Sequence, residues 1–184
     1  MSNWYPEDPS MYEDVQTRWQ YENVGTKKSP QKRLQRLWHG SRDSARTPVQ
    51  WDDSANAGFT TGTPWFYVND NYKEINVAAQ EKDADSVLHF YRKAIGLRKK
   101  LSCVRHGNYK EYGKYSSRFY TYSREDEKQK ILVVCSFSDK TENWKVPGGF
   151  DMKAAGLALC NYPDAVEGKL RPYEARVYLW EKSS

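Results

Sequence analysis

The sequence lacks the features of membrane-spanning, disulfide-rich and metal-binding proteins. No stretch approaches the roughly 20 apolar residues that span a bilayer, and Met1 to Asp14 is too polar and acidic for a signal peptide. The only cysteines, far apart and without a CxxC pair, are Cys103, Cys135 and Cys160. We therefore expect a soluble, cytoplasmic protein with reduced thiols, no signal peptide, no membrane partner, no metal site and no cofactor.

Hydrophobic residues are also few, at 38% of the 184 residues. A chain of this length still suffices for one compact domain, with or without an appendage, that buries roughly 70% of its extended surface. Aromatic residues, by contrast, make up 15%, with 14 Tyr and 7 Trp. Such rings suit a sugar-binding crevice and equally the core of a β-sandwich, so composition leaves both open.

The net charge of +5 makes nucleic acid a possible partner. Part of the excess is local, in one basic window: Lys27, Lys28, Lys32, Arg33, Arg36, Arg42 and Arg46. A solvated helix face explains the same window, and we favour that explanation.

Two helices are predicted in the first forty residues, with start signals at Asp8-Pro9 and Ser29-Pro30. The first should end before Gly25 and the second at Gly40. Their apolar faces are predicted to be Tyr12, Val15 and Trp19 in the first, and Leu34, Leu37 and Trp38 in the second.

The segment from Ser41 to Val77 has neither helical nor strand periodicity. A loop of this length is usually functional or packed by its own side chains. The candidates for that packing are Trp51, Phe59, Trp65 and Phe66. The loop is therefore either a self-packed cover or the wall of a binding site.

A third helix should start at Asp83 or Asp85 and carry an apolar stripe along one face. The stripe consists of Val87, Leu88, Tyr91, Ile95 and Leu101. Gly96 within this helix predicts close packing against a neighbour.

After about residue 103 the apolar period changes to two. Six short strands are predicted: 109–115, 118–123, 131–137, 143–146, 152–159 and 175–180. Short strands separated by turns, with no helices between them, predict an antiparallel sandwich.

Residues 41–52 read SRDSARTPVQWD, and Asn56 to Gly62 and Pro64-Trp65 follow. This string resembles the segment after the eighth barrel strand in oligo-1,6-glucosidases and related α-glucosidases of the α-amylase superfamily of glycoside hydrolases. Further strings are similar to later parts of the same family: 71–77, 85–99, 130–134, 161–162 and 170–175. The resemblance covers essentially the whole chain.

The resemblance implies a mainly β fold with α-helices. Residues 1–102 would be a remnant of the barrel end, with helices, the long loop and the last barrel helix of a truncated (β/α)8 barrel. Residues 103–184 would form the α-amylase-type C-terminal antiparallel β-domain, a sandwich.

The family hydrolyses α-glucosidic bonds with retention, through an aspartate nucleophile and a glutamate acid/base. Neither motif is present, and no histidine is followed by aspartate, as the third family carboxylate would require. We therefore assign no catalytic residue and expect a C-terminal fragment, inactive alone, from a truncation, a split gene or a late start codon. Of the 24 acidic residues that could act as replacement carboxylates, Asp43, Asp52 and Asp53 lie in the loop, but the sequence places no two of them at catalytic separation.

The resemblance implies a substrate-binding role for Arg42, Arg46 and Gln50, because the family loop approaches the active-site mouth. Arginine suits this role since its fork of donors binds hydroxyls or orients a carboxylate. The alternative is that these residues form an ion-pair network with Asp43 and Asp52 that fixes the loop. For the aromatic residues Trp51, Trp65 and Tyr67 we expect packing rather than sugar stacking.

Three partner hypotheses follow. The missing barrel could be a separate chain, with gluco-oligosaccharide bound in the full-length context. A carbohydrate- or partner-binding β-domain protein and a basic nucleic-acid-binding protein are the alternatives. An apolar face at Val87, Leu88, Tyr91 and Ile95 would also allow self-association.

Overall fold

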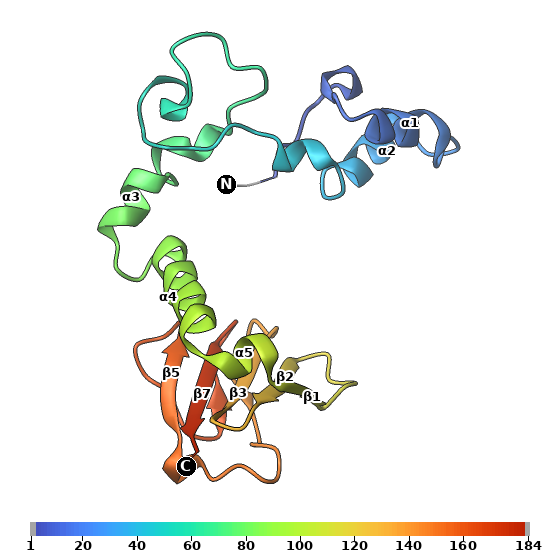
Figure 1. The fold of residues 1–184 in the computed structure, drawn as a ribbon. Coiled ribbons are helices and arrows are strands. Elements are labelled where there is room, and N and C mark those ends of the chain that lie inside the picture. Colours follow the sequence, from blue (N-terminus) through green and yellow to red (C-terminus); the bar gives the residue numbers. More distant parts are fainter. Residues whose placement is uncertain (1–2, 183–184) are drawn as a thin grey trace. The chain divides into compact units, whose positions relative to one another are not determined.

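The computed structural model describes residues 3–182, which fall into two compact units. The first unit extends to Ser86 and is mainly helical, whereas the second begins at Val87 and contains the sheet (Figure 1). The division of the chain after residue 102, which rests on family resemblance, stays a prediction.

The first unit is built from short helices and 3-10 turns. Its helices are α1 (Val15–Asn23), α2 (Pro30–Leu37) and α3 (Val77–Lys82) (Figure 1). The 3-10 turns are Pro9–Met11, Arg42–Ala45, Ala55–Gly58 and Asp70–Lys73. The sequence did not predict α3, which Asn76 caps by accepting a hydrogen bond from the Ala79 backbone N–H at 2.8 Å.

The predicted first helix starts later than expected. Asp8 caps only a 3-10 turn, and α1 begins after Asp14, whose carboxylate accepts hydrogen bonds from both the backbone N–H and the hydroxyl of Thr17. Both Asp8 and Asp14 are therefore N-caps, but only the one at Asp14 precedes an α-helix. The predicted apolar stripe is therefore wrong, since Tyr12 is buried ahead of the helix while Val15 and Trp19 are 79% and 57% exposed.

The second predicted helix is confirmed as α2, which buries Leu34 and Leu37. It ends at Leu37, three residues before the expected Gly40. The two leucines join Trp4, Tyr12 and Phe66 in the core of the first unit. This core holds α2 and the segments before α1 and after residue 65 together.

Aromatic packing contributes little to the long loop, contrary to expectation. Only Phe66 is buried, while Trp51, Phe59 and Trp65 are 51%, 41% and 64% exposed. Backbone and amide hydrogen bonds hold the loop instead: the Asn56 amide donates to the carbonyls of Thr60 and Gly62. A polar side chain that bonds main-chain groups can organise a loop without burying its aromatic rings.

The second unit opens with α4 (Val87–Lys100) and α5 (Ser102–His106). The sequence predicted one helix that included Leu101, but this residue is extended, fully buried and ends α4. Gly96 is not closely packed, because no atom lies within 4 Å of an added Cβ. The exposed stripe of α4 comprises Val87, Tyr91 and Ile95, which are 67%, 64% and 50% exposed.

The predicted antiparallel sheet is confirmed, with strand order β1-β2-β3-β7-β5 (Figure 1). Its strands are β1 (Asn108–Tyr112), β2 (Phe119–Glu125), β3 (Gln129–Ser136), β5 (Gly156–Cys160) and β7 (Ala175–Glu181). The expected second sheet of a sandwich is a short ladder of β4 (Glu142–Asn143) and β6 (Lys169–Leu170). The two-residue β6 was not predicted, and the strand predicted from residue 152 begins instead at Gly156, after a 3-10 turn at Met152–Ala154.

Both faces of the sheet are covered, as the alternation in β3 requires. Ile131 and Val133 pack with Leu101 on the face beneath α5. Leu132 and Val134 pack on the opposite face with Trp144 and other side chains. Within residues 3–182, no helix is long and apolar enough to cross a membrane.

Candidate functional site

The predicted loop is anchored by Asp43, a carboxylate with no exposed surface. One of its oxygens accepts hydrogen bonds from the backbone N–H groups of Glu13 and Asp14, at 2.8 and 3.0 Å. The other oxygen pairs with Arg46 at 3.0 Å. Asp43 thereby joins the start of the loop to the segment that leads into α1.

Asp14 forms the other half of this cluster and is only 3% exposed. One oxygen caps α1 through Thr17, and the other lies 2.7 Å from the guanidinium of Arg42 and 3.6 Å from that of Arg46. Burial disfavours the charged form of Asp14, but the hydrogen bonds from Thr17 and Arg42 outweigh it and lower its pKa. The carboxylate therefore stays ionised near neutral pH and holds both arginines.

The two arginines of the cluster remain open to solvent. The side chain of Arg42 is 60% exposed and that of Arg46 40%, whereas their carboxylate partners are buried. Both guanidinium groups can therefore contact a ligand while the buried carboxylates hold them in position. Of the two interpretations of this loop, the ion-pair network is present, with Asp14 rather than Asp52 as the second carboxylate.

Gln50 lies apart from the arginine cluster and is 3% exposed. Its amide nitrogen donates to the side-chain oxygen of Asn71 at 3.1 Å and to the carbonyl of Ile75 at 2.5 Å. The backbone carbonyl of Gln50 also accepts from Val77. Gln50 therefore ties the middle of the loop to its C-terminal end, and its substrate-binding role stays a prediction.

The aromatic residues of this region divide into exposed and packed ones. Trp51 and Trp65 are exposed, so the expected packing role is wrong for them within residues 3–182, although the Trp65 ring lies tilted against Phe66 with centroids 5.2 Å apart. Tyr67 fits the expectation, since its ring stacks on Trp4 with centroids 5.4 Å apart. The exposed tryptophans are available for contact with another molecule.

The remaining acidic residues of the loop form no catalytic pair that we can assign. Asp52 accepts hydrogen bonds from the backbone and hydroxyl of Ser54, and the hydrogen bonds from Ser54 lower its pKa. A general acid needs a raised pKa, so Asp52 does not fit that role. Among residues 3–182, no three His, Cys, Asp or Glu side chains are grouped so that they could hold a metal ion.

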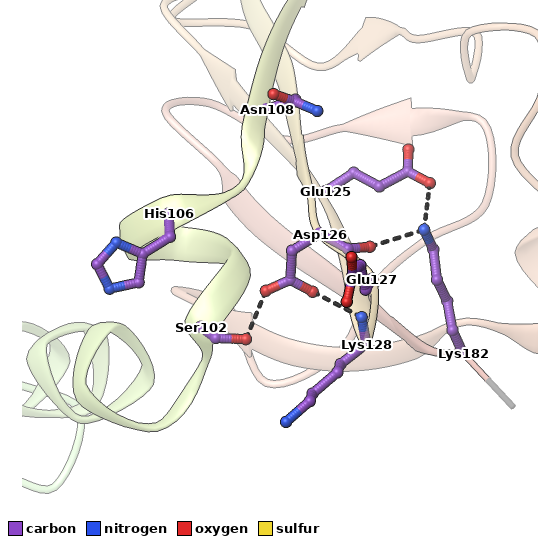
Figure 2. Close-up of a pocket in the computed structure, with 8 residues that line it drawn as sticks. All are labelled: Ser102, His106, Asn108, Glu125, Asp126, Glu127, Lys128 and Lys182. Carbon is purple, nitrogen blue, oxygen red and sulfur yellow. Dashed lines mark hydrogen bonds and ion pairs between the residues drawn. The ribbon is translucent and has the colours of Figure 1, made fainter. Parts of the chain in front are cut away.

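A hollow of about 650 Å³ lies in the second unit, between α5 and the β2–β3 turn (Figure 2). Its charges are largely matched within the chain: Lys182 lies 2.7 Å from a Glu125 oxygen and donates to the Asp126 carbonyl. Ser102 hydrogen-bonds the Asp126 carboxylate. Because most of these groups satisfy one another and, among residues 3–182, no Tyr, Trp or Phe lines the hollow, we assign it no ligand.

Three arginines of the basic window already have partners. The guanidinium of Arg33 lies 4.5 Å from the ring centre of Tyr21 and donates to the Tyr21 carbonyl, while Arg42 and Arg46 pair with carboxylates. The charges of Arg42 and Arg46 are balanced by buried carboxylates, which weakens the basis for the nucleic-acid hypothesis, although their exposed donors can still meet a neutral ligand.

The sequence missed Asp14 as a member of the cluster. Its position before Val15, with Thr17 three residues later, is a capping signal, but the start signal at Asp8-Pro9 competed with it. Asp14 and Arg42 lie far apart in the sequence, so no local sequence pattern predicts that they pair.

The family model of the α-amylase catalytic domain matches residues 9–107, more than half of the chain. The chain therefore belongs to the α-amylase family of glycoside hydrolases. It is similar to the oligo-1,6-glucosidase of Parageobacillus thermoglucosidasius, with 41% identity over 176 residues that cover 91% of this chain and 31% of the relative. The oligo-1,6-glucosidase of Halalkalibacterium halodurans is 39% identical, over 91% of this chain and 31% of that protein.

Solved structures agree with the sequence relatives. The trehalose-6-phosphate hydrolase of Bacillus licheniformis superposes with a TM-score of 0.88 and 34% identity, over 99% of this chain and 34% of that one. The chain thus spans about a third of the length of its relatives. What the whole relatives do is a starting point for a proposal about this chain.

Proposed function

We propose that this chain is the C-terminal part of an oligo-1,6-glucosidase-like α-glucosidase. Residues 1–102 would complete the end of the (β/α)8 barrel, and residues 103–184 would form the C-terminal β-domain. The family match supports this division because it ends at residue 107, directly before β1 begins at Asn108. A cytoplasmic location is part of the proposal and is supported by three cysteines that form no disulfide.

In this proposal the complete enzyme hydrolyses α-glucosidic bonds with retention. That reaction needs two carboxyl groups about 5 to 5.5 Å apart across the scissile bond. We assign neither group to this chain, so the barrel segments would supply both, on the same polypeptide or on a separate one. The chain alone would then be inactive.

The observation that carries the proposed role of this chain is the arginine cluster. Arg42 and Arg46 present exposed guanidinium groups, while the buried carboxylates of Asp14 and Asp43 fix them from the protein side. Donors held in place lose little conformational entropy when they bind sugar hydroxyls. We place these two arginines beside the leaving part of the substrate, with Gln50 as a support of the same loop.

The test is reconstitution of the enzyme from two polypeptides. The chain would be co-expressed with the remaining N-terminal two thirds of the Parageobacillus thermoglucosidasius relative, and hydrolysis of isomaltose and a chromogenic α-glucoside would be measured. We expect turnover only when both polypeptides are present. The variants R42K and R46K should raise KM more than they lower kcat, since lysine lacks the planar fork of donors. R118K, at an exposed pair with Glu142, is the matched control.

One result would overturn this function directly. If the folded chain alone hydrolysed either substrate and D52N or D53N abolished that turnover, the loop itself would be a catalytic centre. A reconstituted enzyme in which R42K and R46K behave like R118K would refute the arginine role and leave the family function intact.

The stripe on α4 supports a second part of the proposal, which concerns partners. Val87, Tyr91 and Ile95 leave half or more of each side chain in water, and we propose that barrel segments cover them. Without those segments, the chain should self-associate through this face. Sedimentation velocity at increasing concentration measures this, and a monodisperse monomer at high concentration would contradict it.

A further inference from the structure

A hollow of about 430 Å³ lies within the first unit, between the segment before α1 and the chain around residue 70. Trp4, Tyr5 and Tyr67 supply its aromatic surface. Glu7 and Asn71 are among its polar groups. Its size falls within the range of small-molecule sites, and aromatic surface with a few polar groups is the usual lining of such sites.

The aromatic floor of the hollow is formed by rings that pack against one another. Trp4 is 6% exposed and stacks on Tyr67 with an interplanar angle of 20°, while its edge contacts Phe66 at 5.0 Å between centroids. The Tyr67 hydroxyl bonds Asp70, and burial together with this bond raises the pKa of Tyr67 to about 12. Tyr5, 46% exposed, presents an additional ring at the rim.

Polar groups with spare hydrogen-bonding capacity surround this floor. The oxygen of the Asn71 side chain accepts from Gln50, but its amide nitrogen donates to no group among residues 3–182. The exposed carboxylate of Glu7 likewise has no partner among the described residues. The side chain of Asn3 adds both a donor and an acceptor to the lining.

This combination favours a ligand with hydroxyl groups over a cation. Aromatic rings and two carboxylates can also attract an ammonium group. Of these groups, Trp4 and Tyr67 are stacked on each other and Asp70 already bonds Tyr67, which leaves the Tyr5 ring and the Glu7 carboxylate. Hydroxyls, which donate and accept, match a mixture of carboxylates and amides, whereas amide donors would repel a cation.

We propose that this hollow binds the sugar rings of a short α-linked gluco-oligosaccharide. The apolar face of a ring would lie against the exposed ring of Tyr5, and the hydroxyls would donate to Glu7 and accept from Asn71. The choice of glucose as the sugar rests on the proposed function, but the hollow and its lining do not. The site is a binding site and includes no group assigned to catalysis.

Isothermal titration of the purified chain with isomaltotriose tests the proposal. We expect saturable binding that Y5A and E7A each weaken about tenfold, which corresponds to about 1.4 kcal/mol. Both residues are exposed, so neither change should unfold the protein, and circular dichroism checks that. The matched controls are Y115A, at a tyrosine that is 94% exposed in the second unit, and D139A, at an exposed carboxylate there.

Three results would overturn the proposal: no saturation with isomaltotriose, equal weakening by Y115A or D139A, or tighter binding of tetramethylammonium than of the sugar. The last would identify a cation site. The titration is independent of turnover. Binding without reconstituted activity would therefore refute the proposed function alone, and reconstituted activity without binding would refute this site alone.

Discussion

Removal of the Glu174 carboxylate should destabilise the second unit more than removal of any exposed charge. Glu174 has no exposed surface and Arg176 is 1% exposed, with the Arg176 Nε 2.7 Å from a Glu174 oxygen. Arg171 adds a 3.0 Å contact to the same oxygen. The remaining Arg176 donors meet the carbonyls of Val166 and Lys169 and the hydroxyl of Tyr178. The pair is thus buried, and each of the three Arg176 nitrogens has a partner.

The magnitude can be worked out in two ways. Breaking a buried ion pair by removing one partner costs about 3–5 kcal/mol, because the other charge is left buried and unpaired. Burial by itself would raise the pKa of Glu174, but hydrogen bonds from Arg171 and Arg176 outweigh it and lower the pKa from 4.5 to about 2. At about 1.4 kcal/mol per pH unit, this difference corresponds to about 3 kcal/mol. The two values agree.

The sign of the pH dependence follows from the lowered pKa. Ionised Glu174 contributes its full stabilisation above about pH 5, and the contribution is lost as the pH falls from there through about 2. Hydrogen exchange of amides in β3 and β7, which reports on the second unit alone, should give a free energy of opening about 3 kcal/mol lower for E174A at pH 7. The variant should also lose less stability than the parent when the pH falls.

The matched control is E142Q, at the Arg118–Glu142 pair, whose arginine is 62% exposed. It should cost at most about 1 kcal/mol. If E174A costs as little as E142Q, or if E174A and the parent lose equal stability between pH 5 and 2, the reasoning about the buried pair is refuted.

Three further predictions concern other residues. D43N should lower the stability of the first unit by about 2–3 kcal/mol, since an amide cannot accept from the two backbone donors and pair with Arg46 as the carboxylate does. Hydrogen exchange of amides in α1 measures this loss. An effect no larger than that of D53N, the control at an exposed site, would contradict the prediction. G58A should destabilise the loop by about 1–2 kcal/mol, because the φ of Gly58 is +65° and the new Cβ would lie 2.6–2.7 Å from the Asp52 carboxylate. Thermal unfolding measures this, and G62A should show no comparable loss because the atom nearest to its new Cβ is 3.7 Å away. Burial raises the pKa of the thiols of Cys103, Cys135 and Cys160. A disulfide reagent at pH 8 should therefore label these thiols much more slowly in the folded chain than in the chain unfolded in urea. Equal labelling rates would show that the thiols are accessible in the folded chain and would contradict the prediction.

Elements with a strong local pattern were predictable from the sequence. The continuous apolar run of β3 and the start signal of α2 are both local, and the structure has both elements close to the expected positions. Leu101 shows the limit of this reasoning. Helical spacing placed it on the stripe of α4, but burial against Ile131 and Val133 holds it extended between two helices. Tertiary packing here overrides the local period.

The candidate site was only half visible in the sequence. Arg42, Arg46 and Asp43 stood out because the surrounding string resembles a known family, but Asp14, the partner of Arg42 and a second partner of Arg46, lies before α1 and outside that string. Trp51 and Trp65 were expected to pack and are exposed, because amide and backbone bonds organise the loop instead. Contacts between side chains that lie far apart in the sequence produce no periodic sequence pattern, so they could not be predicted from it.

The two units use the same chemistry, arginine paired with a buried carboxylate, with different consequences. In the second unit the guanidinium of Arg176 is as buried as its partner Glu174, so its hydrogen bonds end within the chain and can only stabilise the fold. In the first unit Asp14 and Asp43 are buried, but Arg42 and Arg46 remain 60% and 40% exposed. Their carboxylates fix the guanidinium groups without using all of the donors that face water. This asymmetry is why the loop cluster, rather than the stronger buried pair, is suited to contact a substrate.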